Sequence, residues 1–349
     1  MKKFLFFVVA FALTGCSQNW NDLVHEEVPA TFFHFDVVGQ VKSDMNYGER
    51  RIEILLPYDA DVSAVVIKKC EYTPQARCKP DLKAGDIIDL SSPITLTLRT
   101  YDDYVWTLSA TLKPKPASEV YNMGFDLWSQ DVFGFDVPYD SEAPSEDQAV
   151  WDSYNFACSF AQAPVIAPER DSVWESGEGK AAIKLTSRFI SLLEDRFFPG
   201  CIFTGKLDDY YTDKASLGYR FNKRPVTLDG YAWYQPKAID HTADPYTHLA
   251  DSTDKGFVFI ALAKWDEQFA VSPLSAIMDV DNVPGLIASG KVVFDREMGS
   301  YEKFSITLQY KSQETPNHVV IIASSSALGD YRTGADGSVL YLDELGFTY

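Results

Sequence analysis

The side chains best suited to chemistry in this chain are aromatic residues in or beside predicted loops and strand ends. Sugar rings have apolar C–H faces that stack on tryptophan and tyrosine, while polar groups at the rim of a site bind the hydroxyls. The candidates for such contacts are Trp233, Trp265, Tyr331, Arg332, Tyr211 and Trp174. For each of them, a place in the core or at the solvent edge is the alternative interpretation.

Tyr231 and Trp233 form the clearest pattern among these aromatics. They lie two residues apart in a stretch with strand character, so they are expected to share one face of a strand. Tyr234 then points to the opposite face. One of the two faces should be core, which leaves the other as a platform for a ligand.

Paired carboxylates are a second kind of candidate, because glycoside hydrolysis needs two of them at a fixed separation across a cleft. Asp171, Glu175 and Glu178 flank Trp174, which is the kind of place where such a pair would lie. With 50 acidic residues in the chain, the sequence alone selects no pair. We therefore predict no catalytic residue.

Other familiar sites do not occur in the sequence. There is no dinucleotide-binding glycine pattern, no Walker loop and no Gly-x-Ser-x-Gly turn. Residues 279–282 begin like a calcium loop, but the twelfth position is Gly290 instead of the glutamate of an EF-hand. The histidines show no ligand spacing with the cysteines, which disfavours zinc.

The start of the chain indicates export. Lys2 and Lys3 precede an apolar run over residues 4–13, which is too short to span a bilayer. Leu13-Thr14-Gly15-Cys16 resembles a bacterial lipobox. We expect residues 1–15 to be a lipoprotein signal peptide and Cys16 to carry acyl chains, which would anchor the protein to the outer membrane at the cell surface.

The four remaining cysteines permit two disulfides in an exported chain. Cys70 with Cys78 would close a short loop, and Cys158 with Cys201 would pair within the second half of the chain. Buried free thiols are the alternative, because a chain of 349 residues builds a core without covalent links.

The elements that must position these residues are predicted strands. Residues 16–30 are polar and acidic, as in a tether. Over residues 31–113, short alternating runs such as 104–112 are separated by turn residues and predict about seven strands, hence a small antiparallel sandwich. Two prolines then favour an extended linker over residues 114–119.

The rest of the chain, residues 120–349, is predicted to be one large sandwich or jelly roll. One stretch in it is ambiguous. The apolar residues between 180 and 196 fit either a helical stripe or a strand, and we expect a strand followed by one short helical turn.

The charge balance bears on the partner. The chain has 31 basic and 50 acidic residues, a formal charge of −19. Such a chain is repelled by phosphate backbones, so nucleic acid is excluded as a partner. Anionic polymers in general are poor ligands on the same ground, which favours neutral glycans.

Short motifs occur in a characteristic order over residues 120–349. They include GKAAIKLT at 179–186, FTG at 203–205, NKRP at 222–225, LDGY at 228–231, IASSSALGD at 322–330 and LDEL at 342–345. In this order they resemble the putative carbohydrate metabolism domain (PCMD) of Bacteroides-type lipoproteins.

The resemblance implies a galactose-binding-like jelly roll, similar to carbohydrate-binding modules. Residues 122–128 resemble the first strand of such modules and residues 342–345 the last, and these two strands lie side by side in that fold. Many relatives hold a structural calcium ion there, which would make Asp126 and Asp343 ligands. The first segment is similar to the immunoglobulin-like spacer domains that often precede this module.

We therefore expect an all-β protein: an immunoglobulin-like β-sandwich at 31–113, then a galactose-binding-like, carbohydrate-binding-module-like jelly roll at 120–349. The expected function is non-catalytic glycan binding by a lipid-anchored surface protein of a polysaccharide-utilisation system, with partner proteins of an uptake complex. A glycoside hydrolase or lyase is one alternative, and a structural or adhesive surface subunit is another.

Overall fold

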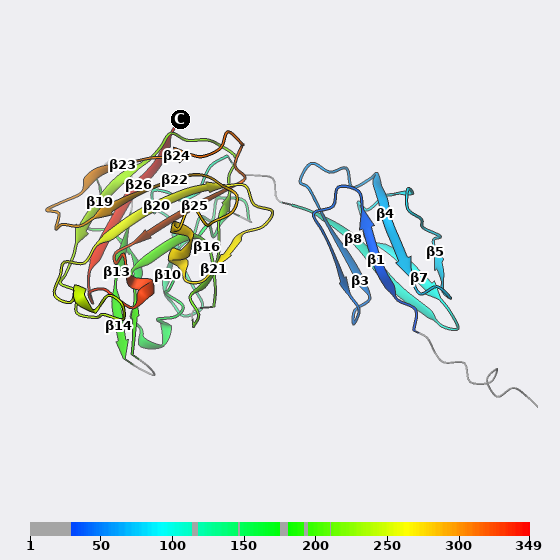
Figure 1. Ribbon diagram of the computed structural model, residues 1–349, viewed down its shortest axis with the longest axis horizontal. Coiled ribbons are helices and arrows are strands. Elements are labelled where there is room, and N and C mark those ends of the chain that lie inside the picture. The colour runs from blue at the N-terminus through cyan, green and yellow to red at the C-terminus, as the bar shows by residue number, and fades with distance from the viewer. Residues whose placement is uncertain (1–28, 114–117, 146, 175–180, 192–194, 210) are drawn as a thin grey trace, which may run out of the picture. The chain divides into compact units, whose positions relative to one another are not determined.

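The computed structural model describes residues 29–113, 118–145, 147–174, 181–191, 195–209 and 211–349. The expected signal peptide, Cys16, most of the tether and most of the linker lie outside these residues. The chain divides into two compact units, Met1–Pro114 and Lys115–Tyr349 (Figure 1). The described part contains strands and short 3-10 helices but no α-helix, and no helix in it could cross a membrane. The expected all-β class is confirmed.

The first unit is a sandwich of two sheets. One sheet has the order β1-β4-β6 and the other β2-β3-β8-β7-β5. Their strands are β1 (Phe32–Val37), β2 (Lys42–Asn46), β3 (Arg51–Leu56), β4 (Val65–Tyr72), β5 (Arg77–Lys79), β6 (Ile87–Ile88), β7 (Ile94–Arg99) and β8 (Asp103–Leu112).

Alternation along the strands builds the interior of the first unit. Ile52, Ile54 and Leu56 of β3 are buried, while the residues between them are exposed or half-buried. Phe32 of β1 packs edge-on against Trp106 of β8, with ring centroids 5.4 Å apart, so the two sheets share one core. Period-two burial is the pattern expected of strands with one solvated face.

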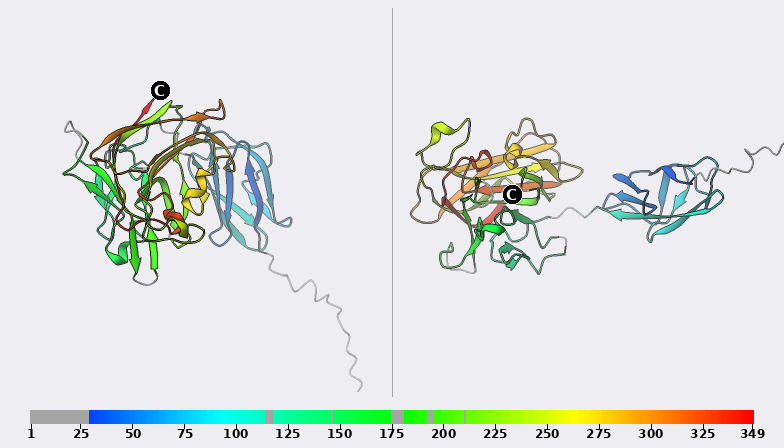
Figure 2. Two further views of the ribbon diagram at one scale, coloured as in Figure 1. Left: turned by 60° about the vertical axis from the view of Figure 1, so that its left-hand side comes forward. Right: turned by 90° about the horizontal axis from the view of Figure 1, so that it is seen from below.

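The second unit has two large sheets that curl around a shared interior (Figure 2). The five-stranded sheet has the order β12-β13-β26-β19-β23. Its strands are β12 (Ile166–Glu169), β13 (Ala182–Thr186), β19 (Thr227–Gln235), β23 (Glu302–Thr307) and β26 (Val339–Thr348).

The nine-stranded sheet follows the path β21-β17-β16-β25-β20-β22-β24, with β11 on β16 and β18 on β25. Its strands are β11 (Trp151–Ser153), β16 (Cys201–Asp209), β17 (Lys214–Leu217), β18 (Tyr219–Arg220), β20 (Gly256–Ala263), β21 (Phe269–Val271), β22 (Leu286–Phe294), β24 (Gln309–Tyr310) and β25 (His318–Ser324). All eight residues of β20 are buried, because this strand is central and covered on both faces.

Among the described residues, two small hairpins and four 3-10 helices complete the second unit. They are β9 (Trp128–Gln130) with β10 (Asp136–Pro138), β14 (Arg188–Ser191) with β15 (Asp195–Phe198), η2 (Ser159–Ala161), η3 (Thr247–Leu249), η4 (Leu274–Met278) and η5 (Gly329–Tyr331). The expected helical turn after residue 186 is wrong. The chain forms the β14–β15 hairpin instead, because Phe189 and Phe197 pair across it on one face.

The hairpin of β22 and β23 splits between the two sheets. At its open end, β24 pairs with Ala288 and Ser289 of β22, but β23 leaves β22 and pairs with β19. β22 and β23 approach each other closely at Gly290, where an added Cβ would lie 2.5 Å from Ile306 Cγ2. Only glycine fits there, and a gap remains between β22 and β23 beyond the crossing.

All four cysteines outside the lipobox lie within the described residues, and all are free thiols. The expected pairs, Cys70 with Cys78 and Cys158 with Cys201, are not formed. The alternative of buried free thiols is the one that the structure has, because Cys158 and Cys201 pack in an apolar core that needs no covalent link.

Candidate functional site

The outer face of the five-stranded sheet carries aromatic side chains from adjacent strands. β19 lies between β26 and β23, and Figure 1 shows it beside β26. In this register, Trp233 is opposite Tyr341, and Tyr231 is opposite Asp343 on β26 and Lys303 on β23. Tyr231 and Trp233 therefore share the outer face, whereas Tyr234 is fully buried beneath it, as the alternation predicted.

These rings form two stacks, and the ring of Tyr301 connects them. Trp233 stacks on Tyr341 with centroids 4.8 Å apart, and Trp174 stacks on Tyr231 with centroids 4.0 Å apart. Tyr301 lies 5.9 Å from the Trp233 ring and 6.4 Å from the Trp174 ring, so it connects the stacks. We call these five residues the aromatic band.

Polar contacts at its edges hold the aromatic band in place. Trp233 Nε1 donates to the Met298 carbonyl at 2.9 Å, and the Tyr301 hydroxyl donates to the Ser172 carbonyl at 2.8 Å. The Trp174 backbone N–H donates to Asp343 Oδ2 at 2.7 Å. Tyr341 is buried and the other four rings are half-buried. The result is a pre-ordered apolar surface, which loses little conformational entropy on binding.

Asp343 is fully buried beside the aromatic band. Its Oδ1 accepts the Glu344 N–H at 2.9 Å, so both of its oxygens bind backbone amides. Burial raises its pKa to about 6, with further contributions from the Glu344 and Asp126 carboxylates, against the opposing effect of the two N–H donors. A carboxylate without solvent access is suited to holding the 174 segment in place, not to protonating a substrate.

The segment that carries Asp126 lies beside β26, which carries Asp343, but the two segments do not pair as strands. Residues 121–124 form a turn, φ is positive at Asn122 and Phe125, and the Leu345 N–H bonds to the Met123 carbonyl. The expectation of a first strand here is wrong, because that turned backbone cannot continue a ladder. Asp126 Oδ1 accepts the Ala181 N–H at 3.1 Å.

The chemistry of these donors bears on the expected calcium ion. A Cβ added to Gly124 would lie 3.4 Å from Asp126 Oδ2 and 3.8 Å from both Glu344 carboxylate oxygens, so the two side chains converge over this glycine. Burial and the Asp126 charge raise the pKa of Glu344. Oxygen donors of like charge suit a hard cation. Within the described residues, however, no group of three or more His, Cys, Asp or Glu side chains is arranged to hold a metal.

A groove of about 300 Å³ adjoins the aromatic band across β23, in the gap where β22 and β23 separate. Phe294, Met298 and Phe304 supply its apolar lining, and the Arg296–Glu302 ion pair, with N and O 2.6 Å apart, lies at its rim. Met298 connects the groove to the aromatic band, because its side chain lines the groove and its carbonyl accepts the Trp233 Nε1–H. This volume is at the lower end of the range for small-molecule sites.

Trp265, another expected contact residue, lies in the core. It is 8% exposed, its ring stacks on Phe269 with centroids 5.0 Å apart, and its Nε1 donates to the Pro284 carbonyl. No ring face is left for a sugar, so the expectation for this residue is wrong and the core alternative applies.

Tyr211, Tyr331 and Arg332 form a separate group at loops of the second unit. Tyr211 is 65% exposed and Tyr331 42% exposed, and Tyr331 packs on Tyr246. Arg332 lies 3.6 Å from Asp213 in an ion pair. Tyr211 lies between β16 and β17 of the nine-stranded sheet, and Tyr331 ends η5. The group therefore comes from other elements than the aromatic band, most of which lies on the five-stranded sheet.

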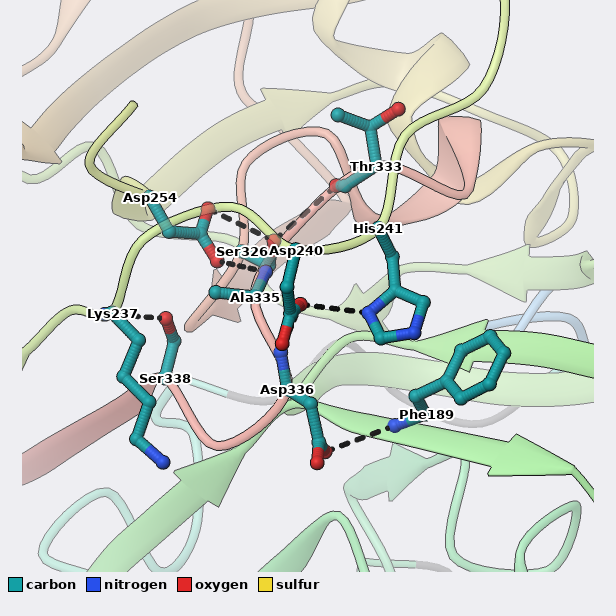
Figure 3. Close-up of polar contacts among 10 residues, drawn as sticks. All are labelled: Phe189, Lys237, Asp240, His241, Asp254, Ser326, Thr333, Ala335, Asp336 and Ser338. Carbon is teal, nitrogen blue, oxygen red and sulfur yellow. Dashed lines mark hydrogen bonds and ion pairs between the residues drawn. The ribbon is translucent and has the colours of Figure 1, made fainter. Parts of the chain in front are cut away.

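A polar network joins the loop after β19, the loop after β25 and the β14–β15 hairpin (Figure 3). Buried Asp254 accepts from Ser326 Oγ and from the Ala335 N–H, each at 3.0 Å. Burial raises its pKa to about 6 despite these donors. The network fixes where the loops stand relative to the hairpin.

Two residues of this network, Asp336 and His241, contact Phe189 of the hairpin (Figure 3). The Phe189 N–H donates to Asp336 Oδ1 at 3.1 Å, and the Phe189 ring stacks on His241 with centroids 3.7 Å apart. His241 Nδ1 in turn lies 2.7 Å from Asp240 Oδ1. One face of the hairpin is thereby held against the loops.

Two residues of the aromatic band were not expected as contacts from the sequence: Tyr301 and Tyr341. Tyr231 has the right period, but Tyr341 and Tyr301 join the band through strand register and a loop. Register depends on pairing between segments more than 100 residues apart, so no local pattern could have identified them.

Comparison with known proteins identifies a family and a shared fold. The family described as "Putative carbohydrate metabolism domain" matches residues 124–348, more than half of the chain. No curated protein matches. One solved structure, titled as a "putative glycoside hydrolase" from Bacteroides thetaiotaomicron, is similar with a TM-score of 0.53 and 19% identity, over 93% of this chain and 99% of that one.

A second solved structure, titled as a "putative glycoside hydrolase" from Bacteroides vulgatus, is similar with a TM-score of 0.51 and 17% identity. The likeness covers 64% of this chain and 96% of that one. At such identities, the two structures show that the fold is shared and no more.

Proposed function

Since the chain belongs to the family of the putative carbohydrate metabolism domain, we propose that its second unit binds a glycan through the aromatic band without cleaving it. The observation that carries this proposal is the pair of ring stacks joined by Tyr301 on a solvent-facing sheet. Stacked aromatic rings with polar neighbours match the alternating apolar faces and hydroxyls of sugars.

The surroundings support binding more than catalysis. The carboxylate beside the band, Asp343, is buried and bonded through both oxygens. The adjoining groove has Glu302 at its rim, but this residue is paired with Arg296. A glycosidase needs an acid and a second carboxylate that both reach the scissile bond.

Affinity gels containing neutral plant and host polysaccharides test the proposal. Trp174→Ala and Tyr231→Ala should each weaken retention about fivefold, since an aromatic contact contributes about 1 kcal/mol beyond area burial. Tyr349→Ala, at a ring that is 60% exposed elsewhere in the same unit, is the matched control. Equal retention of all variants, or release of reducing sugars by the wild type, would contradict the proposal.

We also propose that a calcium ion is held by Asp126 and Asp343. Bound there, it would offset the charges of Asp126 and Asp343 and fix the 121–124 turn against β26. Millimolar CaCl₂ should raise the melting temperature relative to EGTA, and Asp126→Asn should abolish this difference. An equal calcium response in Asp126→Asn would contradict the assignment.

The proposal includes a surface location. Lipid on Cys16 would present the glycan-binding unit outside the cell as part of a polysaccharide-utilisation system, with the first unit as a spacer. Cys16→Ala should move the protein from the membrane fraction to the soluble fraction. External protease should degrade the wild-type protein on intact cells, and protection from it would contradict surface exposure.

A further inference from the structure

The β14–β15 hairpin has a second face, opposite to the one held by the polar network of Figure 3. Phe189 and Phe197 are on the held face, near His241. The register pairs Arg188 with Phe198 and Ile190 with Arg196, so the two arginines share the other face. The hairpin thus positions two guanidinium groups on one side of a rigid support.

Arg196 is 5% exposed and has incomplete hydrogen bonding. Its Nη2 forms an ion pair with Asp213 Oδ1, and its guanidinium lies 4.7 Å from the centre of the Phe198 ring. Its Nε is buried without a partner, and so is the Nε of Arg188.

Two further unpartnered groups lie in the segment that packs against these arginines. Tyr154 is 1% exposed and Ser159 is 3% exposed, and neither hydroxyl has a partner. Tyr154 lies next to Phe198 of the hairpin, with ring centroids 6.3 Å apart, on the face that carries both arginines. The charges of Arg188 and Arg196 oppose the effect of burial, which raises the pKa of the Cys158 thiol to about 12. The Cys158 N–H bonds to the Tyr154 carbonyl.

Four buried donors without partners in one place need an explanation, since more than nine in ten buried polar groups in proteins are bonded. Two are guanidinium nitrogens, which only donate, and two are hydroxyls, which can donate. A bound group that only accepts would satisfy donors of both kinds. Ionised carboxylates and related oxyanions are such acceptors.

The local charge agrees with this donor set. Arg332 reaches the same place through its ion pair with Asp213, so three arginines converge there. The carboxylates that face them are Asp213 and Asp330, while Asp209 is engaged by the Tyr211 N–H and the Thr212 hydroxyl. Basic groups outnumber the acids in direct contact here, although the whole chain has 31 basic and 50 acidic residues.

We propose that this arginine cluster, made of Arg188, Arg196 and Arg332, binds the carboxylate of an acidic sugar such as a uronic acid. The planar guanidinium fork matches a carboxylate with two parallel hydrogen bonds. Arg332 is 40% exposed and gives the ligand access, and the exposed Tyr331 next to it offers a ring for the sugar face. The sugar part of the ligand rests on the proposed function, and the carboxylate part rests on the cluster itself.

The arginine cluster would accept a kind of ligand, an acidic sugar, that the net charge of the chain disfavours. A charge of −19 disfavours anionic polymers over most of the surface. A local excess of arginine creates one place where an acidic residue of a mixed glycan is accepted, while the aromatic band takes its neutral residues. Such a pairing selects glycans that contain both.

Titration of the full chain with sodium glucuronate and with glucose tests the cluster. Glucuronate should bind and glucose should not, and binding should weaken as NaCl rises, because the contact is ionic. Arg332→Gln and Arg188→Gln should each reduce affinity about tenfold. Arg99→Gln, at an exposed arginine of the first unit, is the matched control.

A variant that should bind glucuronate more tightly separates an effect on binding from an effect on folding. Asp213→Asn removes the carboxylate that now occupies Arg196 and Arg332, so it should tighten glucuronate binding, which a merely structural role would not produce. Melting temperatures confirm that each variant is folded. Equal binding of glucose and glucuronate, unchanged affinity in Arg332→Gln, or tighter binding of sulfate than of glucuronate would overturn the assignment.

The outcomes also distinguish this inference from the proposed function. Glucuronate binding that depends on Arg332, without retention on any polysaccharide gel, would uphold the cluster and refute the glycan-binding band. Loss of gel retention in Trp174→Ala, together with no glucuronate binding, would uphold the glycan-binding band and refute the cluster.

Discussion

The two units of this chain differ in what they bury. In the described part of the first unit, Thr73 is the single buried residue with a polar or charged side chain, and the ion pairs lie on the surface. The second unit buries charged and polar residues throughout, including Asp147, Arg196, Asp254 and Asp343. Both are sandwiches with period-two strands, so the fold class does not account for the difference.

This contrast supports the proposal that the second unit carries the binding sites. Buried polar groups destabilise a protein unless they are fully paired, and they persist chiefly where function requires them. The first unit has the interior of a structural element, in which solvent-exposed charge pairs add little. The second unit holds buried carboxylates and the aromatic band within one module, and five of its described buried polar side-chain atoms lack a partner, against Trp106 Nε1 in the first unit. Experiments that treat the two units separately can therefore test the contrast.

Truncation in the core of the first unit should have the largest effect. Trp106 is 2% exposed between the two sheets, so Trp106→Ala should destabilise that unit by about 3–5 kcal/mol. Hydrogen exchange measured by mass spectrometry on the full chain should show this loss in residues 29–113 only. Faster exchange in the second unit as well would show that the units are coupled.

Breaking a buried ion pair in the second unit should have the next largest effect. Asp147 is 2% exposed and is bonded by Arg220 Nη2 at 2.6 Å and by the Tyr219 hydroxyl. Arg220→Met should cost about 3 kcal/mol, because it leaves a buried carboxylate without its cation. Arg51→Met, at an exposed pair of the first unit, is the matched control and should leave the denaturation midpoint unchanged.

The pH dependence should be smaller and of a defined sign. Burial raises the pKa of Asp254 from its ordinary value of 3.8 to about 6. Stability from this group is therefore full below pH 4 and is lost as pH rises through 6, by about 1–3 kcal/mol. Asp254→Asn should flatten this dependence in denaturant titrations from pH 4 to 7. An unchanged slope would show that Asp254 is not the group responsible.

The first unit should not share this behaviour. Its acidic residues with shifted pKa values, Asp61 and Asp89, are shifted downward, mainly by bonds from nearby serines. A downward shift stabilises the folded form above the ordinary pKa of aspartate. Between pH 4 and 6, hydrogen exchange should therefore show falling stability in the second unit and little change in the first, whose own loss comes below pH 4.

Reduction should have the smallest effect in either unit. The four thiols are free, and burial raises the pKa of Cys70 to about 12 and that of Cys78 to about 11, which keeps both protonated and unreactive at neutral pH. Dithiothreitol should leave the melting temperature unchanged, and a thiol reagent should label the native protein slowly. A drop in melting temperature on reduction would restore the disulfide hypothesis.

The sequence predicted what depends on local pattern. Period two gave the strands and the shared face of Tyr231 and Trp233, because side-chain alternation is a property of each strand alone. It could not give the band itself, since Tyr341 reaches Trp233 only through the pairing of β26 with β19. The helical turn expected after residue 186 failed for the same reason: pairing with β15 decided the conformation of β14.

The arginine cluster was the least predictable part of the candidate sites. Arg332 was singled out by its loop context, but its companions Arg188 and Arg196 come from a hairpin, and Asp213 comes from another loop. No motif links these residues, since their association is decided by how loops pack at one end of the sandwich. Trp265 shows the converse, because loop context suggested exposure where packing against Phe269 buries the ring.

The crossing of the chain at Gly290 has a mechanical consequence. One uninterrupted segment pairs with β19 in one layer and, a few residues later, with β22 in the other. The layers cannot slide past each other unless one of these pairings breaks, so the crossing resists shear between them. Tension on a bound polymer would leave the spacing between the band and the groove intact, and the first response to load should come from the loops.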